Sequence, residues 1–336
     1  MKLRNFMFIF LIALLLGTFS TQVCAATYTI LFAGQQPPDH PLTAYQWKFK
    51  ELAEEYSNGE IEVKVYHSNQ LGGNTEANEA VRDGSIQMAY SSIAYISSNF
   101  NPKFYITNLP FLVTRDNVST FYELMDGEVG QRLGKELEKN NIRLMGYIQL
   151  GFRNITNSVR PVREPKDLEG LKIRLQPNEV HVESFRAFGA NPLSLDWAEV
   201  YSALQQKVID GEENPVDIIY LNNFFETQDY CTLSGHFFDI GGVYMNMDFY
   251  NNLPEDMKRI VERAGLEAAQ YQRQVSTDSE NEYVAKLKEK MEVIELPEDG
   301  LKKFQEKSEI MYEKIRSIVK DDQLVDDFLN ALRPQD

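Results

Sequence analysis

The sequence has few of the residues that build metal and thiol sites. Its 336 residues include two cysteines and four histidines. No two histidines stand at the spacing of metal ligands and no HExxH pattern occurs, which argues against metal catalysis. A glycine-rich phosphate loop and a GxSxG elbow are also missing. We therefore expect no metal and no cofactor, although the abundant carboxylates leave a glycosidase with a paired-acid mechanism open.

Long hydrophobic runs are scarce as well. The pronounced one extends from Phe6 to Gly17 and has 12 residues, whereas a membrane-spanning helix needs roughly 20. Basic residues precede this run, and small residues placed for signal peptidase follow it at 23–25. We predict that residues 1–25 are a cleaved signal peptide and that the protein is periplasmic. Lipidation of Cys24 is the alternative, but the residue before this cysteine is not the small one that lipidation requires.

Positively charged residues are fewer than negatively charged ones. There are 34 Lys and Arg residues against 50 Asp and Glu, a net charge of −16. This balance disfavours nucleic acid and anionic membranes as partners, and an anionic ligand would need a local cluster of positive side chains. The apolar fraction of 43% is that of a globular protein, and the length predicts two lobes. Beyond the predicted signal only Cys231 is left, so no intramolecular disulfide is expected.

Strand and helix patterns alternate along the chain. Segments with strand character lie at 28–33, 61–66, 86–90, 142–147 and 171–175. Segments with helical periodicity lie at 42–56, 74–82, 180–188 and 198–206. This alternation predicts an α/β fold with mostly parallel sheets. Because no flexible linker stands out, we expect ordinary strands and helices to join the two lobes.

The region from Pro254 to about Met291 has an unusually long helical composition, interrupted only by Gly265. A helix of that extent would be roughly 55 Å long and would exceed one lobe. We therefore predict a continuous or kinked helix that runs along both lobes. The alternative is two helices broken near residues 276–278, where N-cap residues occur.

The middle third carries the most specific pattern. Its pieces are Gly151-x-Arg153, Asp167-Leu-Glu-Gly-Leu-Lys-Ile-Arg174, Phe188-Gly-Ala190, Glu199-Val-Tyr-Ser-Ala-Leu-Gln205 and Asp210-Gly-Glu-Glu-Asn-Pro215. Together with flanking echoes, this ordered set resembles the solute-binding proteins of tripartite ATP-independent periplasmic (TRAP) transporters. The resemblance covers essentially the whole chain after the predicted signal.

The resemblance implies a two-lobed periplasmic binding protein fold with a ligand cleft between the lobes. We expect one lobe from 26–150 plus 239–279 and the other from 151–238 plus 280–336. Such a monomer would close on a small organic acid, a sugar acid such as a hexuronate or a C4-dicarboxylate, and deliver it to the membrane subunits of a TRAP transporter without covalent chemistry. Zwitterions such as ectoine stay possible. The rival functions are a periplasmic enzyme acting on sugar acids and a sensory module for a receptor kinase.

Two arginines and an asparagine are the first candidate ligand contacts. Arg174 ends a strand in which it alternates with apolar residues, and strand ends are where ligands bind in open α/β sheets. Its guanidinium matches a carboxylate with two parallel hydrogen bonds, although a surface arginine is the plainer interpretation. Arg153, placed after a strand, either supports the ligand or pairs with a nearby acid. Asn214 before Pro215 suits a helix N-cap, and the resemblance assigns it to the ligand carboxylate.

The resemblance assigns five further residues to the cleft. Trp197 would lie against the ligand, with core packing as the alternative. Four residues from the first lobe would contact the end of the ligand away from the carboxylate. They are Gln35, Asn74, Ser92 and Tyr95. Asn74 could instead be only an N-cap, and Tyr95 only a packing residue.

Overall fold

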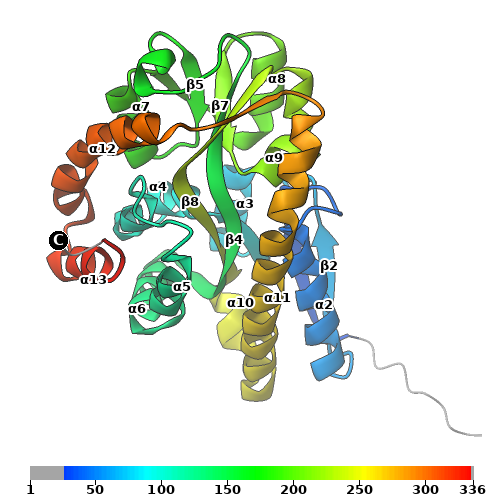
Figure 1. Ribbon diagram of the computed structural model, residues 1–336. Helices are drawn as coiled ribbons and strands as arrows, with labels where there is room; N and C mark the ends of the chain where they lie inside the picture. Colours follow the sequence, from blue (N-terminus) through cyan, green and yellow to red (C-terminus); the bar gives the residue numbers. More distant parts are fainter. Residues whose placement is uncertain (1–25, 334–336) are drawn as a thin grey trace, which may run out of the picture.

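The computed structural model describes residues 26–333, so the predicted signal peptide lies outside the described residues. Its strands form one mixed sheet with the order β2-β1-β3-β8-β4-β7-β5-β6, and β9 pairs with β8 (Figure 1). The strands are β1 Tyr28–Ala33, β2 Ile61–Tyr66, β3 Met88–Ser92, β4 Ile142–Asn157, β5 Lys172–Leu175, β6 Asn191–Ser194, β7 Gly211–Asn214, β8 Tyr230–Asn246 and β9 Glu292–Glu295.

Strand direction differs between the ends and the middle of the sheet. The outer pairs β1–β2, β1–β3, β5–β6 and β5–β7 are parallel, as predicted. The central pairs β3–β8, β4–β8 and β4–β7 are antiparallel, so the expectation of mostly parallel sheets fails at the centre. The physical reason is that β4 and β8, 16 and 17 residues long, run antiparallel to each other through the centre. They join the first half of the molecule, which contains β1, β2 and β3, to the second half, which contains β5, β6 and β7.

The strand predicted at 142–147 continues to Asn157, and this extension corrects the position of Arg153. Arg153 lies inside β4 and not after a strand. The pairing of β4 with β8 shifts register between Gln149 and Gly151, where Gly151 has a φ of +118° that other residues rarely adopt. The strand therefore passes through a bulge immediately before Arg153.

Helices cover both faces of the sheet. In chain order they are α2 Thr43–Tyr56, α3 Asn74–Asp83, α4 Ile93–Asn99, α5 Val118–Asp126, α6 Glu128–Glu136, α7 Glu179–Phe188, α8 Val200–Gln205, α9 Val216–Leu221, α10 Met247–Asn252, α11 Glu255–Lys288, α12 Glu298–Val319 and α13 Asp322–Leu332. Short 3-10 turns lie at Pro102–Asn108, Leu137–Asn140, Pro165–Leu168, Trp197–Glu199 and Phe224–Glu226. In the described part of the chain no helix is long and apolar enough to cross a membrane.

The alternation of side chains along the strands explains how the sheet is covered. Phe32 and Ala33, neighbours on β1, belong to different apolar clusters because successive strand residues point to opposite faces. Two such clusters flank the first half of the sheet, and two smaller ones contain residues of the second half. Cys231 is a buried free cysteine in one of the smaller clusters. Both halves therefore pack on apolar clusters, and residues of α7 and α12 join the largest cluster, on the first half.

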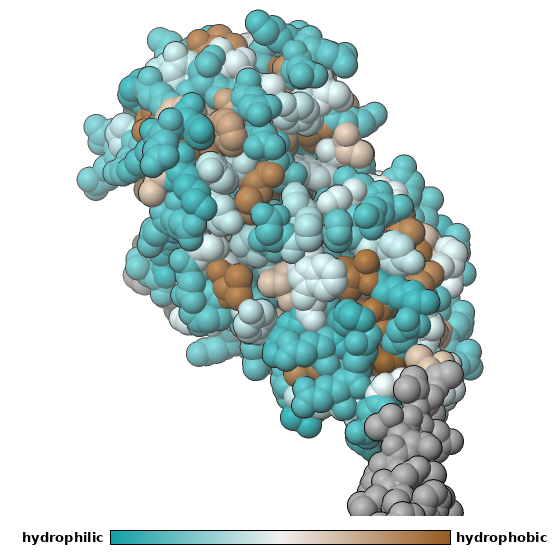
Figure 2. All heavy atoms as spheres, turned by 90° about the vertical axis from the view of Figure 1, so that its right-hand side faces the viewer, coloured by the Kyte–Doolittle hydropathy of each residue, from teal (hydrophilic) through white to brown (hydrophobic). Residues whose placement is uncertain are grey.

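The long helix α11 is continuous over 34 residues, about 51 Å at 1.5 Å per residue. The alternative of two helices broken near 276–278 is wrong. The helix packs against α2 and β4 and, further along, against α9 and β9, so it spans both halves of the molecule (Figure 1). Gly265 permits close packing, because a Cβ there would lie 3.0 Å from the carbonyl oxygen of Met145 on β4. The face of the molecule that α11 and α2 share carries mostly hydrophilic side chains (Figure 2).

The C-terminal helices return towards the first half of the sheet. Helix α12 packs against α7 and the turn Pro102–Asn108, and α13 packs against α5. Leu324 and Phe328 of α13 share an apolar cluster with Phe121 of α5. The chain after α11 thus contacts both halves, which adds a peripheral connection to the one made by β4 and β8.

Candidate functional site

Arg174 lies on β5 with no side-chain exposure, whereas Lys172 on the same strand is exposed. The predicted alternation is confirmed, because Ile173 and Leu175 enter an apolar cluster. The guanidinium donates through Nε and Nη2 to the carbonyl oxygen of Leu195, at 3.0 and 2.8 Å. Its third nitrogen, Nη1, is buried and has no hydrogen-bond partner. Since unpaired buried donors are costly, this side chain has an unused hydrogen-bonding group inside the protein.

Tyr95 connects Arg174 to the other half of the molecule. Its hydroxyl accepts from Nη2 of Arg174 at 3.2 Å and from the backbone N–H of Trp197 at 3.0 Å. Burial raises the pKa of Tyr95 to about 12, so the hydroxyl stays protonated. The Trp197 ring is half-buried and packs on Phe224 with ring centroids 5.6 Å apart. The contact with Phe224 thus explains part of the burial of the Trp197 ring.

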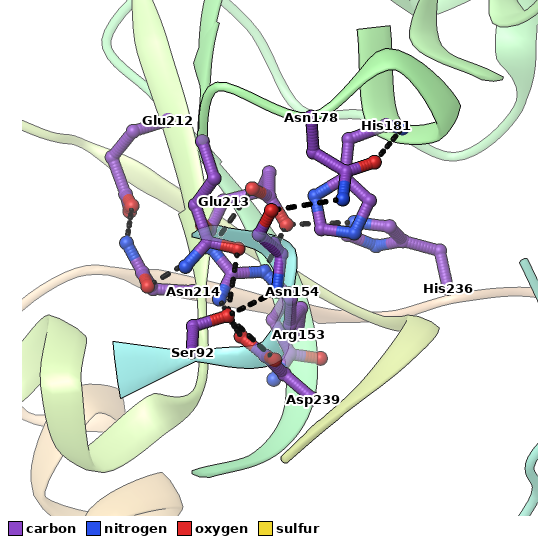
Figure 3. A network of polar contacts seen from close by, with 12 residues as sticks. Ser92, Arg153, Asn154, Asn178, His181, Glu212, Glu213, Asn214, His236 and Asp239 are labelled. Carbon is purple, nitrogen blue, oxygen red and sulfur yellow. Dashed lines mark hydrogen bonds and ion pairs between the residues drawn. The ribbon is translucent and has the colours of Figure 1, made fainter. Parts of the chain in front are cut away.

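Arg153 is also fully buried, but carboxylates surround it (Figure 3). Nε and Nη2 donate to the two carboxylate oxygens of Glu213 at 2.5 and 2.8 Å, and Nη1 donates to Asp239 at 2.7 Å. Nη2 also donates to Oδ1 of Asn214 at 3.0 Å. Pairing with nearby acids, the plainer interpretation of this residue, is what the structure shows. Burial alone would lower the pKa of Arg153, but the two carboxylates outweigh it and raise the pKa.

The three buried carboxyl groups around Arg153 differ in their pKa. Burial raises the pKa of Glu213, yet Arg153 and His236 together hold it well below its ordinary value. Burial dominates for Asp239, whose pKa rises to about 6, and for Glu212, whose pKa rises to about 7. Glu213 is therefore the permanent counterion of Arg153, and the other two can change protonation near neutral pH.

Asn214 is the last residue of β7, and the expectation that it caps the next helix is wrong. Helix α9 begins at Val216 with Pro215 at its N-cap and no side-chain cap. The amide of Asn214 instead accepts from Arg153 and donates to Glu212. It is held in the strand because both its polar atoms find buried charged partners there.

Ser92 ties the start of α4 to the carboxylate cluster. Its hydroxyl accepts from the N–H of Ala94 at 3.1 Å, which makes it the N-cap of α4. The same hydroxyl lies 2.9 Å and 3.0 Å from the two oxygens of Asp239 and 3.3 Å from the side-chain oxygen of Gln176. Gln176 follows Arg174 by two residues. Ser92 and Tyr95, which come from the first half of the molecule, therefore both contact the C-terminal end of β5.

Asn74 and Gln35 lie in the same first half but have no described contact with either arginine. Asn74 is the first residue of α3, and Gly73 is the N-cap, so the suggestion that Asn74 caps this helix is wrong. Its Oδ1 accepts from Ser91 at 2.9 Å. Gln35 is buried, and its Nε2 has no hydrogen-bond partner.

The two halves of the molecule contact each other directly over this site. Besides Tyr95 with Arg174 and Ser92 with Gln176, Thr75 donates to Asp196 at 3.0 Å. The surface hollows beside α5, α11 and α12 hold none of the predicted site residues. The two halves of the molecule are therefore linked by hydrogen bonds on both sides of Arg174.

No role was predicted from the sequence for the acidic residues of this site. Glu212 and Glu213 stand in the quoted motif but were not assigned a role there. Asp239 was missed altogether, although it is the lone charge in the run Phe237 to Val243. A single acid in a strand that is otherwise apolar is a usable signal, because a buried carboxylate needs a partner.

A sheet whose two halves are joined by crossing strands, with a buried arginine where the halves meet, is the architecture expected of a solute-binding protein. Residues 32–317 match the family of bacterial extracellular solute-binding proteins, family 7. The chain belongs to this family. The 2,3-diketo-L-gulonate-binding periplasmic protein YiaO of Escherichia coli (strain K12) is 30% identical over 86% of this chain and 87% of its own length.

Solved structures agree with this assignment. A TRAP periplasmic solute-binding protein from Sulfurospirillum deleyianum with bound succinate has a TM-score of 0.85 and 30% identity, covering 92% of this chain and 100% of that one. The sugar acid binding protein DctPAm from Advenella mimigardefordensis in complex with galactonate has a TM-score of 0.88 and 28% identity, covering 92% and 99%. The protein is thus a TRAP periplasmic solute-binding protein, which confirms the predicted fold and location and decides against the enzyme alternative.

Proposed function

We propose that the protein captures a small organic acid in the periplasm through Arg174 and delivers it to the membrane subunits of a TRAP transporter. The observation that carries this proposal is the unpaired Nη1 of the fully buried Arg174 guanidinium. It lies at the seam between the lobes, where Tyr95 contacts Arg174 and Ser92 contacts Gln176. A ligand carboxylate would supply the missing acceptor. Succinate in one structural neighbour and galactonate in another support a carboxylate as the common group.

The other predicted residues would complete the site in this proposal. Trp197 and Tyr95 share a hydrogen bond beside the guanidinium and would line the ligand. Gln35, with its unpaired Nε2, and Asn74 would approach from the first lobe. Arg153 and Asn214 would support the site through the carboxylate cluster.

We propose that the lobes comprise 26–150 plus 239–279 and 151–238 plus 280–336, and that they open by rotation about β4, β8 and α11. Gln272 on α11 marks the crossing point, since its amide bonds both the N–H and the carbonyl oxygen of Gln149 on β4, at 2.8 and 2.9 Å. The helix should bend or change slope when the lobes close, near Gly265 or 276–278. Free and bound crystal structures with the same helix curvature and lobe angle would contradict this mechanism.

A calorimetric comparison of arginine variants tests the anchor. We expect Arg174→Ala to bind its acid at least about 100-fold more weakly while remaining folded, because it removes a charged hydrogen-bonding partner. Arg174→Lys should also bind poorly, since an ammonium cannot reproduce the planar fork. Arg186→Ala on the exposed part of α7 is the matched control and should bind like the wild type. Binding within threefold of wild type for either Arg174 variant would refute the assignment.

Reconstituted uptake tests delivery. Proteoliposomes that contain the membrane subunits of its TRAP transporter should take up the acid only when the protein is added. A sensory module for a receptor kinase would bind the same acid without supporting uptake. We expect the protein to act as a monomer, and light scattering of the purified chain with and without ligand measures this directly.

A further inference from the structure

The site has one open position for a carboxylate and not two. Arg174 offers the unpaired Nη1, whereas all three nitrogens of the Arg153 guanidinium donate to protein acceptors. Ser92, which contacts Asp239, and Tyr95, which contacts Arg174, both stand at the N-terminal end of α4, so the surroundings of the two arginines adjoin each other. A second ligand carboxylate near Arg153 would have to displace Asp239 or Glu213 from it.

Away from Arg174, Asp239 provides the site with a negatively charged hydrogen-bond acceptor. Its side chain is 1% exposed and lies between Ser92, at 2.9 and 3.0 Å, and Arg153, at 2.7 Å. Ser92 is the N-cap of α4 and Tyr95 lies in its first turn, so both side chains come from the N-terminal end of this helix. The seam therefore runs from the Arg174 guanidinium past Tyr95 to the Ser92 hydroxyl and the Asp239 carboxylate.

The charges around this seam disfavour a second anion. The buried cations are Arg153 and Arg174, and the buried carboxyl groups near them are Asp239, Glu212 and Glu213. The imidazoles of His181 and His236 add no lasting positive charge, because burial lowers the pKa of both. A ligand with one carboxylate meets Arg174, but a ligand with two brings its second charge against Asp239 in a site that excludes water.

We propose that the ligand is a hydroxylated monocarboxylate and that the pair Asp239–Ser92 accepts its hydroxyl groups and excludes a second carboxylate. An ionised carboxylate is an acceptor with several lone pairs, so it suits hydroxyl donors, and the Ser92 hydroxyl can both donate and accept. This inference rests on the proposed function, because it presupposes that Arg174 binds the ligand carboxylate. It makes Asp239 the residue that determines ligand class.

Isothermal titration of the full mature chain with D-galactonate, D-glucuronate and succinate tests the inference. We expect at least one of the two sugar acids to bind tenfold or more tightly than succinate. Asp239→Asn keeps the shape and an acceptor for Ser92 but removes the charge. In this variant the ratio of the sugar-acid affinity to the succinate affinity should fall at least tenfold. Asp248→Asn on α10, away from the seam, is the matched control and should leave the ratio unchanged.

A second variant keeps the test decisive if Asp239→Asn is unstable. Ser92→Ala retains the charge of Asp239, so it should weaken sugar-acid binding severalfold and leave succinate excluded. Succinate binding by the wild type as tightly as either sugar acid, or an unchanged ratio in folded Asp239→Asn, would overturn the inference while the organic-acid function stands. If none of the three acids binds and Arg174→Ala changes nothing in a wider screen of carboxylates, the proposed function itself fails.

Discussion

Arg153 and Arg174 are the same residue type, buried to the same degree, and differ in what surrounds them. Arg153 donates to two carboxylates and an amide, whereas Arg174 donates to a carbonyl oxygen and a tyrosine hydroxyl and keeps one nitrogen unpaired. Arg153 therefore completes the protein interior, and Arg174 has binding capacity left for a ligand. Burial alone therefore does not distinguish the two arginines, but hydrogen-bond saturation does, and this difference is the reason for proposing Arg174 as the one that binds the ligand.

The largest effect should come from removing the saturated arginine. We expect Arg153→Met to lower the free energy of unfolding by about 3–5 kcal/mol, because it leaves Glu213 and Asp239 buried without their cation. Arg174→Met should lower it by only about 1–2 kcal/mol, because the carbonyl oxygen of Leu195 loses its donor but no carboxylate loses its cation. Urea unfolding of both variants at pH 7 measures the difference. Equal losses would show that the two arginines are both structural.

The next effect concerns the pH dependence of the cluster around Arg153. Burial raises the pKa of Glu212 from 4.5 to about 7. The folded protein therefore holds this proton more tightly than the unfolded chain, and the resulting stability is present below pH 4.5 and lost as the pH rises to about 7. Asp217 and Asp239 act in the same direction, because burial raises their pKa values to about 7 and about 6.

Glu212→Gln removes this dependence while its amide can still pair with Thr156 and Asn214. We expect the loss of unfolding free energy between pH 4.5 and pH 7.5 to be smaller than in the wild type by about 1–3 kcal/mol. Glu298→Gln, exposed on α12, is the control and should follow the wild-type curve. Parallel curves for wild type and Glu212→Gln would mean that Glu212 is ionised throughout this range.

A smaller effect is expected on the Arg174 side. Tyr95→Phe removes the hydroxyl that accepts from Arg174 and from the N–H of Trp197. We expect a loss of about 1–2 kcal/mol in unfolding free energy and a severalfold loss of ligand affinity, because one buried donor loses its acceptor and the guanidinium loses a support. Tyr201→Phe, whose hydroxyl bonds Glu226 on the surface, should change neither quantity appreciably. Wild-type affinity in Tyr95→Phe would separate Tyr95 from the ligand site.

The smallest effect should be that of salt on ligand capture. The chain has a net charge of −16, so its overall field repels an anion, while the contact with Arg174 is buried. Salt screens the distant repulsion over a Debye length of about 8 Å and leaves the buried contact largely unchanged. The association rate should be flat or rise slightly from low to physiological salt. Stopped-flow fluorescence of Trp197 and Trp47 measures it, and a steep fall would reveal a positive surface that steers the ligand.

Local patterns in the sequence predicted the elements well where local physics decides them. The strands at 28–33 and 61–66 begin and end as predicted, and the long helical composition after Pro254 forms one helix. The motifs also singled out both arginines, although their burial was not predicted and their contact with a ligand stays a prediction. In these cases the periodicity of side chains or a run of helix-forming residues carries the information.

Tertiary contacts decided what the sequence left open. The antiparallel crossing of β4 and β8 depends on pairing between segments about 90 residues apart, which no local pattern encodes. Asn214 was expected at a helix N-cap, but buried charges from two other positions hold it in a strand. The sequence by itself determined the elements, the family motifs and the shortage of positive charge. Only the tertiary structure decided that Arg153 is paired and Arg174 is not, because hydrogen-bond saturation depends on which distant side chains share the same buried space.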